Sequence, residues 1–157
     1  MAVRFHRGGT LLTFGTGGAS ADAQHVSVEF VHPVIVGKRA LPAIALTADV
    51  ASITGIAEQS GFDQVFARQI RALARPGDIA LGIGDGLSVG EGIRAARDLG
   101  LLTVALTSTG AGGGHGADHA LVAASGDPRV VKEIHVTMYH VLWELVHVFF
   151  EQPGALA

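Results

Sequence analysis

Two stretches of the sequence place histidine and carboxylate side chains at a spacing that suits proton transfer or metal binding. His25 and Glu29 are four residues apart, so both lie on one face if this stretch is helical. A second stretch has His140, Glu144 and His147 at four- and three-residue intervals. An imidazole and a carboxylate on one face can act as acid and base near neutral pH, or as two metal ligands. The alternatives are a surface ion pair in the first stretch and packed, hydrogen-bonded histidines in the second, which is otherwise apolar.

A glycine-rich segment, G-T-G-G-A-S over residues 15–20, lies between an apolar run and the stretch that contains His25. Glycine lets a ligand approach the backbone closely, and the free amides at a helix start attract anions. Ser20 stands where the dinucleotide-binding pattern G-x-G-x-x-G has its third glycine, and the segment has no P-loop lysine. We therefore expect no nucleotide cofactor, and either a ligand-binding loop or a simple tight turn.

The elements that must position these residues alternate along the chain. Five short apolar runs, each followed by glycine, aspartate, serine or threonine, are typical of buried strands and cover residues 10–14, 42–46, 78–83, 101–106 and 120–124. Amphipathic stretches predict helices over residues 21–31, 64–73, 88–99 and 128–151. This order predicts an α/β fold, a three-layer αβα sandwich with a five-stranded parallel sheet of the flavodoxin-like type, as a single domain over residues 1–157. In such folds ligands bind at the carboxyl edge of the sheet.

The composition limits the function classes. Of 157 residues, 48% are apolar and 16% are charged, which excludes a disordered chain. The net charge of −3 gives no reason to expect nucleic acid as a partner. No cysteine is present, so disulfides, thiolate catalysis and cysteine-ligated zinc are excluded. No apolar run approaches the ~20 residues of a membrane helix and the start has no signal-peptide core, so we expect a cytoplasmic protein without a membrane partner. The low charge predicts a homo-oligomer, a dimer or tetramer, that buries apolar surface between copies.

Four segments taken together are similar to the phosphoheptose isomerase branch of the sugar isomerase (SIS) domain proteins. They are G-T-G-G-A-S-A-D-A-Q-H-V-S-V-E-F (15–30), L-P-A-I-A-L-T-A-D (41–49), G-F-D-Q-V-F-A-R-Q (61–69) and K-E-I-H-V-T-M-Y-H (132–140), in the family's order and spacing. The resemblance implies an enzyme that interconverts the aldose and ketose forms of sedoheptulose 7-phosphate or a related sugar derivative. It implies Glu29 as the catalytic base and His140 as its acid partner. It also implies a zinc ion, found in some members, at His25, Glu29 and His140.

The resemblance further implies which positions contact the substrate, a sugar phosphate or sugar derivative. They are Gly17, Gly18 and Ser20 in the glycine-rich segment, Asp49 after the second apolar run, Gly84, Asp85 and Ser88 after the third, and Asp127 before the last helix. Asp127 precedes a proline, so it is also an ordinary helix start.

Departures from the family pattern concern the substrate phosphate. The family's serine in the first loop is Ala19 here, and its hydroxyl-rich loop S-T-S-G-N-S is G-D-G-L-S-V at residues 84–89. Asp85 thus adds a negative charge where the family binds phosphate. Either Asp85 turns outward or caps the next helix, or the protein no longer binds phosphate there.

Other departures concern the metal and the start of the chain. The family's metal-binding glutamine is Lys132 here, and a protonated amine cannot bind a cation, although His135 or His147 could replace it. The resemblance also implies further N-terminal helices that build the tetramer. The sequence begins close to the first strand and lacks them, so we expect either that the true start lies earlier or that the oligomer is assembled differently. These changes leave a second hypothesis open, a non-catalytic SIS domain that binds a carbohydrate derivative or a partner protein as a regulatory or accessory subunit.

Overall fold

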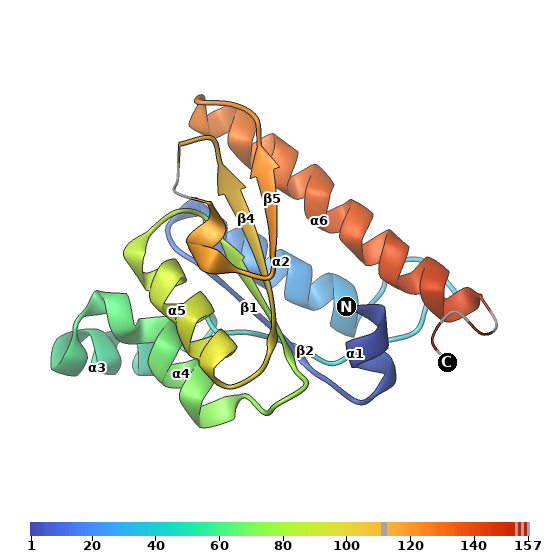
Figure 1. The fold of residues 1–157 in the computed structure, drawn as a ribbon, viewed down its shortest axis with the longest axis horizontal. Coiled ribbons are helices and arrows are strands. Elements are labelled where there is room, and N and C mark those ends of the chain that lie inside the picture. The colour runs from blue at the N-terminus through green and yellow to red at the C-terminus, as the bar shows by residue number, and fades with distance from the viewer. Residues whose placement is uncertain (111–112, 153, 155, 157) are drawn as a thin grey trace.

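The computed structural model describes residues 1–110, 113–152, 154 and 156, and its centre is a parallel sheet (Figure 1). The strands are β1 (Leu11–Gly15), β2 (Ala43–Ala45), β3 (Ile79–Ile83), β4 (Leu102–Ser108) and β5 (His119–Ala123). Their spatial order is β2-β1-β3-β4-β5, and every neighbouring pair is parallel. The predicted five-stranded parallel sheet of the flavodoxin-like type is confirmed.

Helices cover both faces of this sheet, which confirms the three-layer sandwich (Figure 1). One face is covered by α1 (Ala2–His6), α2 (Gly18–Val31) and α6 (Pro128–Glu151). The other is covered by α3 (Val50–Ser60), α4 (Val65–Leu73) and α5 (Leu87–Asp98). Two short 3₁₀ turns, η1 (Phe62–Gln64) and η2 (Gly114–Gly116), lie in the connections.

The strands are apolar throughout because both of their faces are buried. Successive side chains of a strand point to opposite faces, so Leu11 packs in one core cluster and Leu12 in the other. Leu11 shares its cluster with Phe30 of α2 and Trp143 of α6, whereas Leu12 shares its cluster with Phe66 of α4. The alternation divides the core into two layers, and the layer beneath α2 and α6 supports the candidate site.

Two helices were not expected from the sequence, α1 and α3. The first lies in the segment that was expected to lead directly into a strand, and it packs on the core through Ala2 and Phe5. The second, V-A-S-I-T-G-I-A-E-Q-S, is rich in β-branched residues, contains a glycine and has no buried residue. Its weak helical pattern explains why it was missed, and Asp49 at its N-cap helps to form it.

The connections bring helix starts to the carboxyl edge of the sheet. After β1 the chain enters α2, after β3 it enters α5, and after β5 it enters α6. Helices α2 and α6 lie beside each other over the same sheet face, and their contact creates the site described next. None of the helices in the described ranges combines the length and the apolar character needed to span a bilayer.

Candidate active site between α2 and α6

A ladder of polar contacts joins α2 to α6. At its first step the Lys132 ammonium donates to both carboxylate oxygens of Asp22, each at 2.7 Å. At its second step the Tyr139 hydroxyl lies 2.9 Å from Nδ1 of His25. At its third step the indole Nε1 of Trp143 donates to the Glu29 backbone carbonyl at 2.8 Å. These contacts fix the rotation of the two helices, so that the predicted catalytic residues face each other.

His25, Glu29 and His140 form one cluster at the middle of this ladder. Their possible ligand atoms all lie within 4.8 Å of one another. Nε2 of His25 is 3.3 Å from Oε1 of Glu29, and the ring centroids of His25 and His140 are 5.1 Å apart. The Glu29 side chain is 14% exposed and that of His25 is 44% exposed, so the cluster opens to solvent on one side. The structure therefore brings together a carboxylate and an imidazole from distant parts of the chain, as acid–base chemistry requires.

Tyr139 is a member of the site that the sequence did not reveal. Its side chain is almost fully buried, its hydroxyl contacts His25, and its ring centroid is 4.7 Å from that of His140. Burial, followed by the nearby carboxylates of Asp22 and Glu29, raises the pKa of Tyr139 to about 12. The hydroxyl therefore keeps its proton at neutral pH, and it orients the His25 ring by a hydrogen bond to Nδ1.

An absorbance titration can test the environment of this hydroxyl directly, because Tyr139 is the one tyrosine of the chain. We expect tyrosinate to form with a midpoint near pH 12, instead of the usual pH of about 10. Since the folded pKa is raised, the associated stabilisation is complete below pH ~10 and is lost as the pH rises towards ~12. Glu29→Gln should lower the midpoint, because it removes one of the negative charges. A midpoint near 10 in the native protein would contradict the buried placement.

The donor set of the cluster fits a zinc ion with an open position. Two histidines and a glutamate are a common set of three protein ligands in catalytic zinc sites. With a metal at Nε2 of His25, Nδ1 would carry a proton and donate to Tyr139, the kind of outer hydrogen bond that orients metal-binding histidines. Lys132 is not a ligand, because its amine is paired with Asp22.

The other two histidines considered as replacement ligands do not join the cluster. Nε2 of His135 is buried and 3.0 Å from the Thr107 carbonyl. Both ring nitrogens of His147 lie near backbone carbonyls, those of Trp143 at 2.9 Å and of Arg39 at 3.0 Å. These histidines hold α6 to the rest of the fold. Glu144, on the same helix, pairs with Lys38 instead.

The glycine-rich loop lies at the carboxyl edge, at a distance from the cluster. Gly17 adopts a positive φ of 58° and precedes α2, and Ser20 donates its hydroxyl to the Gly17 carbonyl at 2.7 Å. Gly17 and Gly18 are exposed. Glu29 follows Gly18 along the helix by about 16 Å at 1.5 Å per residue, so the loop and the cluster are not in direct contact through this helix.

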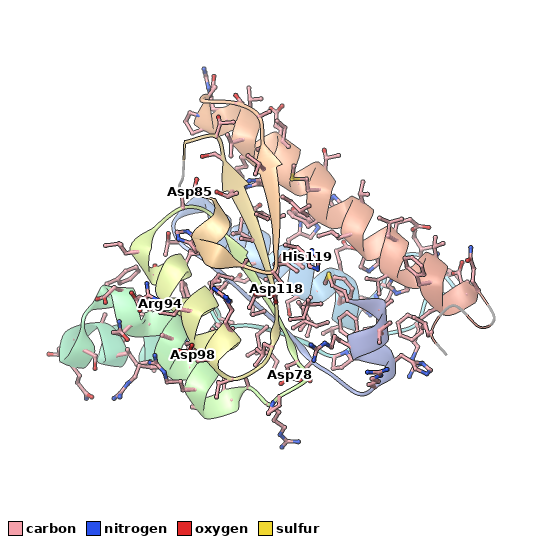
Figure 2. All side chains as sticks on the ribbon, in the orientation of Figure 1. Asp78, Asp85, Arg94, Asp98, Asp118 and His119 are labelled. Carbon is pink, nitrogen blue, oxygen red and sulfur yellow. The ribbon has the colours of Figure 1, made fainter. Side chains whose placement is uncertain are left out.

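Asp85 is exposed, but it does not cap α5 as one of the sequence-based alternatives expected. The N-cap of α5 is Gly86, with no side-chain hydrogen bond. Asp85 instead accepts hydrogen bonds from the Thr107 hydroxyl and, at 2.7 Å, from the Ser108 hydroxyl at the end of β4. Figure 2 shows Asp85 at this edge of the sheet. Ser88, the remaining hydroxyl of the loop, is buried in the first turn of α5, and Gly84 has a φ of 101°.

The two other predicted substrate contacts are helix caps in this structure. Asp49 accepts hydrogen bonds from the hydroxyl and the amide of Ser52, which hold the pKa of Asp49 below its usual value. Asp127 caps α6, and the side chain and the amide of Arg129 hold the pKa of Asp127 low in the same way. Both carboxylates therefore remain ionised, and both lie at the carboxyl edge.

Comparison with known proteins identifies the family to which the chain is similar. A model of the SIS domain matches residues 1–108. The phosphoheptose isomerase of Desulfovibrio desulfuricans is 44% identical over 162 residues, which cover 100% of this chain and 77% of that protein. The phosphoheptose isomerase of Roseiflexus sp. is 44% identical over 155 residues, 94% of this chain and 78% of that protein. The solved phosphoheptose isomerase of Francisella tularensis superposes with a TM-score of 0.87 at 32% identity, over 94% of this chain and 81% of that one.

Proposed function

The chain belongs to the phosphoheptose isomerase family of SIS-domain proteins, and from that premise we propose that it interconverts sedoheptulose 7-phosphate, or a closely related sugar derivative, with its aldose isomer. Its similarity to phosphoheptose isomerases over nearly the whole chain identifies it as a sugar-phosphate isomerase. The observation that supports the assignment of residues is the cluster of Glu29, His140 and His25, whose reactive atoms lie within 4.8 Å of one another.

Aldose–ketose interconversion needs one group that removes a proton from carbon and one that protonates the carbonyl oxygen. In our proposal the Glu29 carboxylate takes the proton from C1 of the ketose, while His140 donates a proton to the C2 oxygen and an enediol forms. Glu29 then returns its proton to C2 while His140 takes the proton of the O1 hydroxyl, so that the carbonyl forms at C1, the aldose is complete and both residues regain their starting protonation. The position of Glu29 favours this role, because its side chain is 14% exposed and its carboxylate lies beside the imidazoles of His25 and His140.

The direct test is incubation of the purified protein with sedoheptulose 7-phosphate, followed by NMR detection of the aldose phosphate. We expect turnover by the native chain. The accessory-subunit hypothesis is favoured by one observation, the carboxylate of Asp85 in the loop where the family has hydroxyls. It predicts binding of the sugar phosphate without turnover, even at an enzyme concentration close to that of the substrate.

A second prediction, independent of the turnover test, concerns the effect of the Asp85 carboxylate on binding of the substrate phosphate. Its carboxylate lies beside the start of α5, where it would repel a bound anion. We expect Asp85→Ser to lower the KM for the sugar phosphate by about tenfold or more, with a smaller change in kcat, since the reacting carbons lie elsewhere. Asp98→Ser is the control, because Asp98 is an exposed carboxylate at the opposite end of the same helix, α5. An unchanged KM in Asp85→Ser would show that the phosphate binds away from this loop.

We propose that the metal, where one is bound, is zinc at His25, Glu29 and His140. When bound, it would act as a Lewis acid that polarises the sugar carbonyl. Elemental analysis of protein purified without chelator should find about one zinc per chain, and His25→Ala should lose it. Lys132→Gln, which supplies a neutral donor in place of the ammonium, should tighten zinc binding measured by competition with a chelator dye. Substoichiometric zinc in both the native protein and Lys132→Gln would remove the metal from the proposal.

We also propose that the chain forms a single SIS domain and acts in the cytoplasm as a homo-oligomer, a dimer or a tetramer. The absence of cysteine suits a reducing compartment. Along the outer side of α6 an apolar groove of about 550 Å³ is lined by residues that include Leu121, Met138 and Leu145. Such a groove suits burial against another copy. Sedimentation velocity decides the subunit number, and a monomer at micromolar concentration would contradict this part.

A further inference from the structure

A small cavity with an unusual lining lies at the amino edge of the sheet, opposite the carboxyl edge. Two turns form it, the turn between α1 and β1 and the turn between α4 and β3. Its volume is about 160 Å³, and it is lined by Arg4, Arg7, Gly8, Gly9, Arg75, Pro76, Gly77 and Asp78. Figure 2 shows Asp78 and Asp85 at opposite ends of β3, so this cavity is remote from the loop that contains Asp85. We call it the amino-edge pocket.

The lining of the pocket carries more positive than negative charge. Arg4 lies in α1 and Arg7 is the C-cap residue that follows this helix, three positions later. Among the described residues, the side chains of Arg4, Arg7 and Arg75 take part in no ion pair and no hydrogen bond. Asp78 is the one acidic residue in the lining, which has three arginines.

Asp78 serves to build the pocket and does not pair with the arginines. One of its oxygens accepts a hydrogen bond from the Thr10 amide at 2.8 Å, and the other accepts one from the Arg75 amide at 2.7 Å. The side chain thus ties the two turns together. Its negative charge offsets one of the three arginines, so the lining keeps an excess of positive charge.

The backbone of both turns is closely packed around the cavity. At Gly9 a side chain would come within 2.6 Å of the Gly77 carbonyl oxygen, so the turns touch there. Gly77 has a φ of 100°, and among the described residues its amide donates to no protein acceptor. Nη1 of Arg4 reaches to 4.0 Å from the point that a side chain at Gly77 would occupy. A free amide and a guanidinium therefore converge on the same space.

We propose that the amino-edge pocket binds a phosphate group, as a site separate from the active site. Guanidinium groups are planar forks that match phosphate oxygens in pairs, and they stay charged at every physiological pH. The cavity corresponds to roughly five water volumes at ~30 Å³ each, which suits one phosphate and not a larger ligand. The phosphate is either inorganic phosphate or the terminal group of a small phosphomonoester whose remainder projects into solvent.

The test is a phosphate titration of ¹⁵N-labelled full-length protein, observed by TROSY spectra at constant ionic strength. Inorganic phosphate and glycerol 3-phosphate are titrated separately. We expect the amides of Gly77, Gly8 and Gly9 to shift and saturate with either probe. A tighter constant for the monoester indicates a metabolite as the ligand, and equal constants indicate inorganic phosphate. Unshifted amides at these glycines would overturn the proposal.

Variants assign the binding to the arginines. Arg7→Gln and Arg75→Gln should each weaken binding about tenfold, because each removes a charge-assisted hydrogen bond. Both side chains are exposed, and the unshifted remainder of the spectrum reports that the fold is intact. Arg68→Gln is the control, since Arg68 lines a different groove next to β2. Equal affinity of the native protein and both pocket variants would refute the site, even if phosphate shifts other amides near the catalytic cluster.

Discussion

Glu29→Gln is expected to lower kcat for isomerisation by 10²- to 10⁴-fold, roughly the share that a positioned general base contributes. Glutamine keeps the shape of the side chain and can still form a hydrogen bond with Nε2 of His25, which lies 3.3 Å from the carboxylate. It cannot accept a proton from carbon. The backbone carbonyl of residue 29, which Trp143 contacts, is unaffected. Because Glu29 is proposed to act on the reacting carbons and not on the substrate phosphate, KM should change by less than kcat.

Several controls make this result specific. Glu144→Gln removes another carboxylate from the α2–α6 side, but one that is paired with Lys38, so its activity should stay near that of the native chain. Zinc content is measured on the same samples, because Glu29 is also a candidate ligand. Retention of more than half of the native kcat by Glu29→Gln would eliminate this carboxylate as the base. If the loss of kcat were fully explained by a loss of bound zinc, Glu29 would be a metal ligand and not the base.

The fold follows closely from the sequence, because the strands are buried on both faces. Continuous apolar runs such as 78–83 have few alternatives when they alternate with amphipathic helices. The sequence did not predict α3, because that helix is exposed and contains several β-branched residues, which have a low helix propensity. Tertiary contacts and the Asp49 cap stabilise the helix instead. It placed the end of β4 two residues early, and those two residues, Thr107 and Ser108, are the partners of Asp85.

The candidate site was only partly accessible from the sequence. The spacing of His25 and Glu29 identified one face of a helix, and the family resemblance added His140. Neither could reveal the contacts that depend on how α2 is rotated against α6, namely Tyr139 on His25 and Lys132 on Asp22. Tyr139 stands next to His140 in the sequence, but an adjacent residue on a helix points about 100° away, so the helical pattern assigns it to the core.

Trp143→Ala is expected to lower the free energy of unfolding by about 3–5 kcal/mol, the usual effect of removing a large buried aromatic side chain. The indole is 5% exposed, packs in the core cluster with Phe30 and Tyr139, and lies with its ring centroid 4.3 Å from that of His147. Since small domains have a total stability of about 5–15 kcal/mol, this loss is a large fraction of the whole. Urea unfolding followed by far-ultraviolet circular dichroism measures it, at fixed protomer concentration because the chain is proposed to be an oligomer.

Trp143→Phe keeps an aromatic ring in the core but removes the hydrogen bond from the indole to the Glu29 carbonyl. Its stability therefore shows how much this one contact contributes to holding the end of α2. Glu29 lies in the last turn of α2, and the residue four positions later is Pro33, which has no amide hydrogen. The Glu29 carbonyl is therefore satisfied by the indole Nε1 at 2.8 Å. Phenylalanine leaves it without a donor, so we expect a loss of about 1–3 kcal/mol, smaller than that of alanine. Thr54→Ala, on exposed α3, should change stability by less than ~0.5 kcal/mol. A Trp143→Phe variant as stable as the native chain would show that this contact does not hold the end of α2 in place, and with it the position of Glu29.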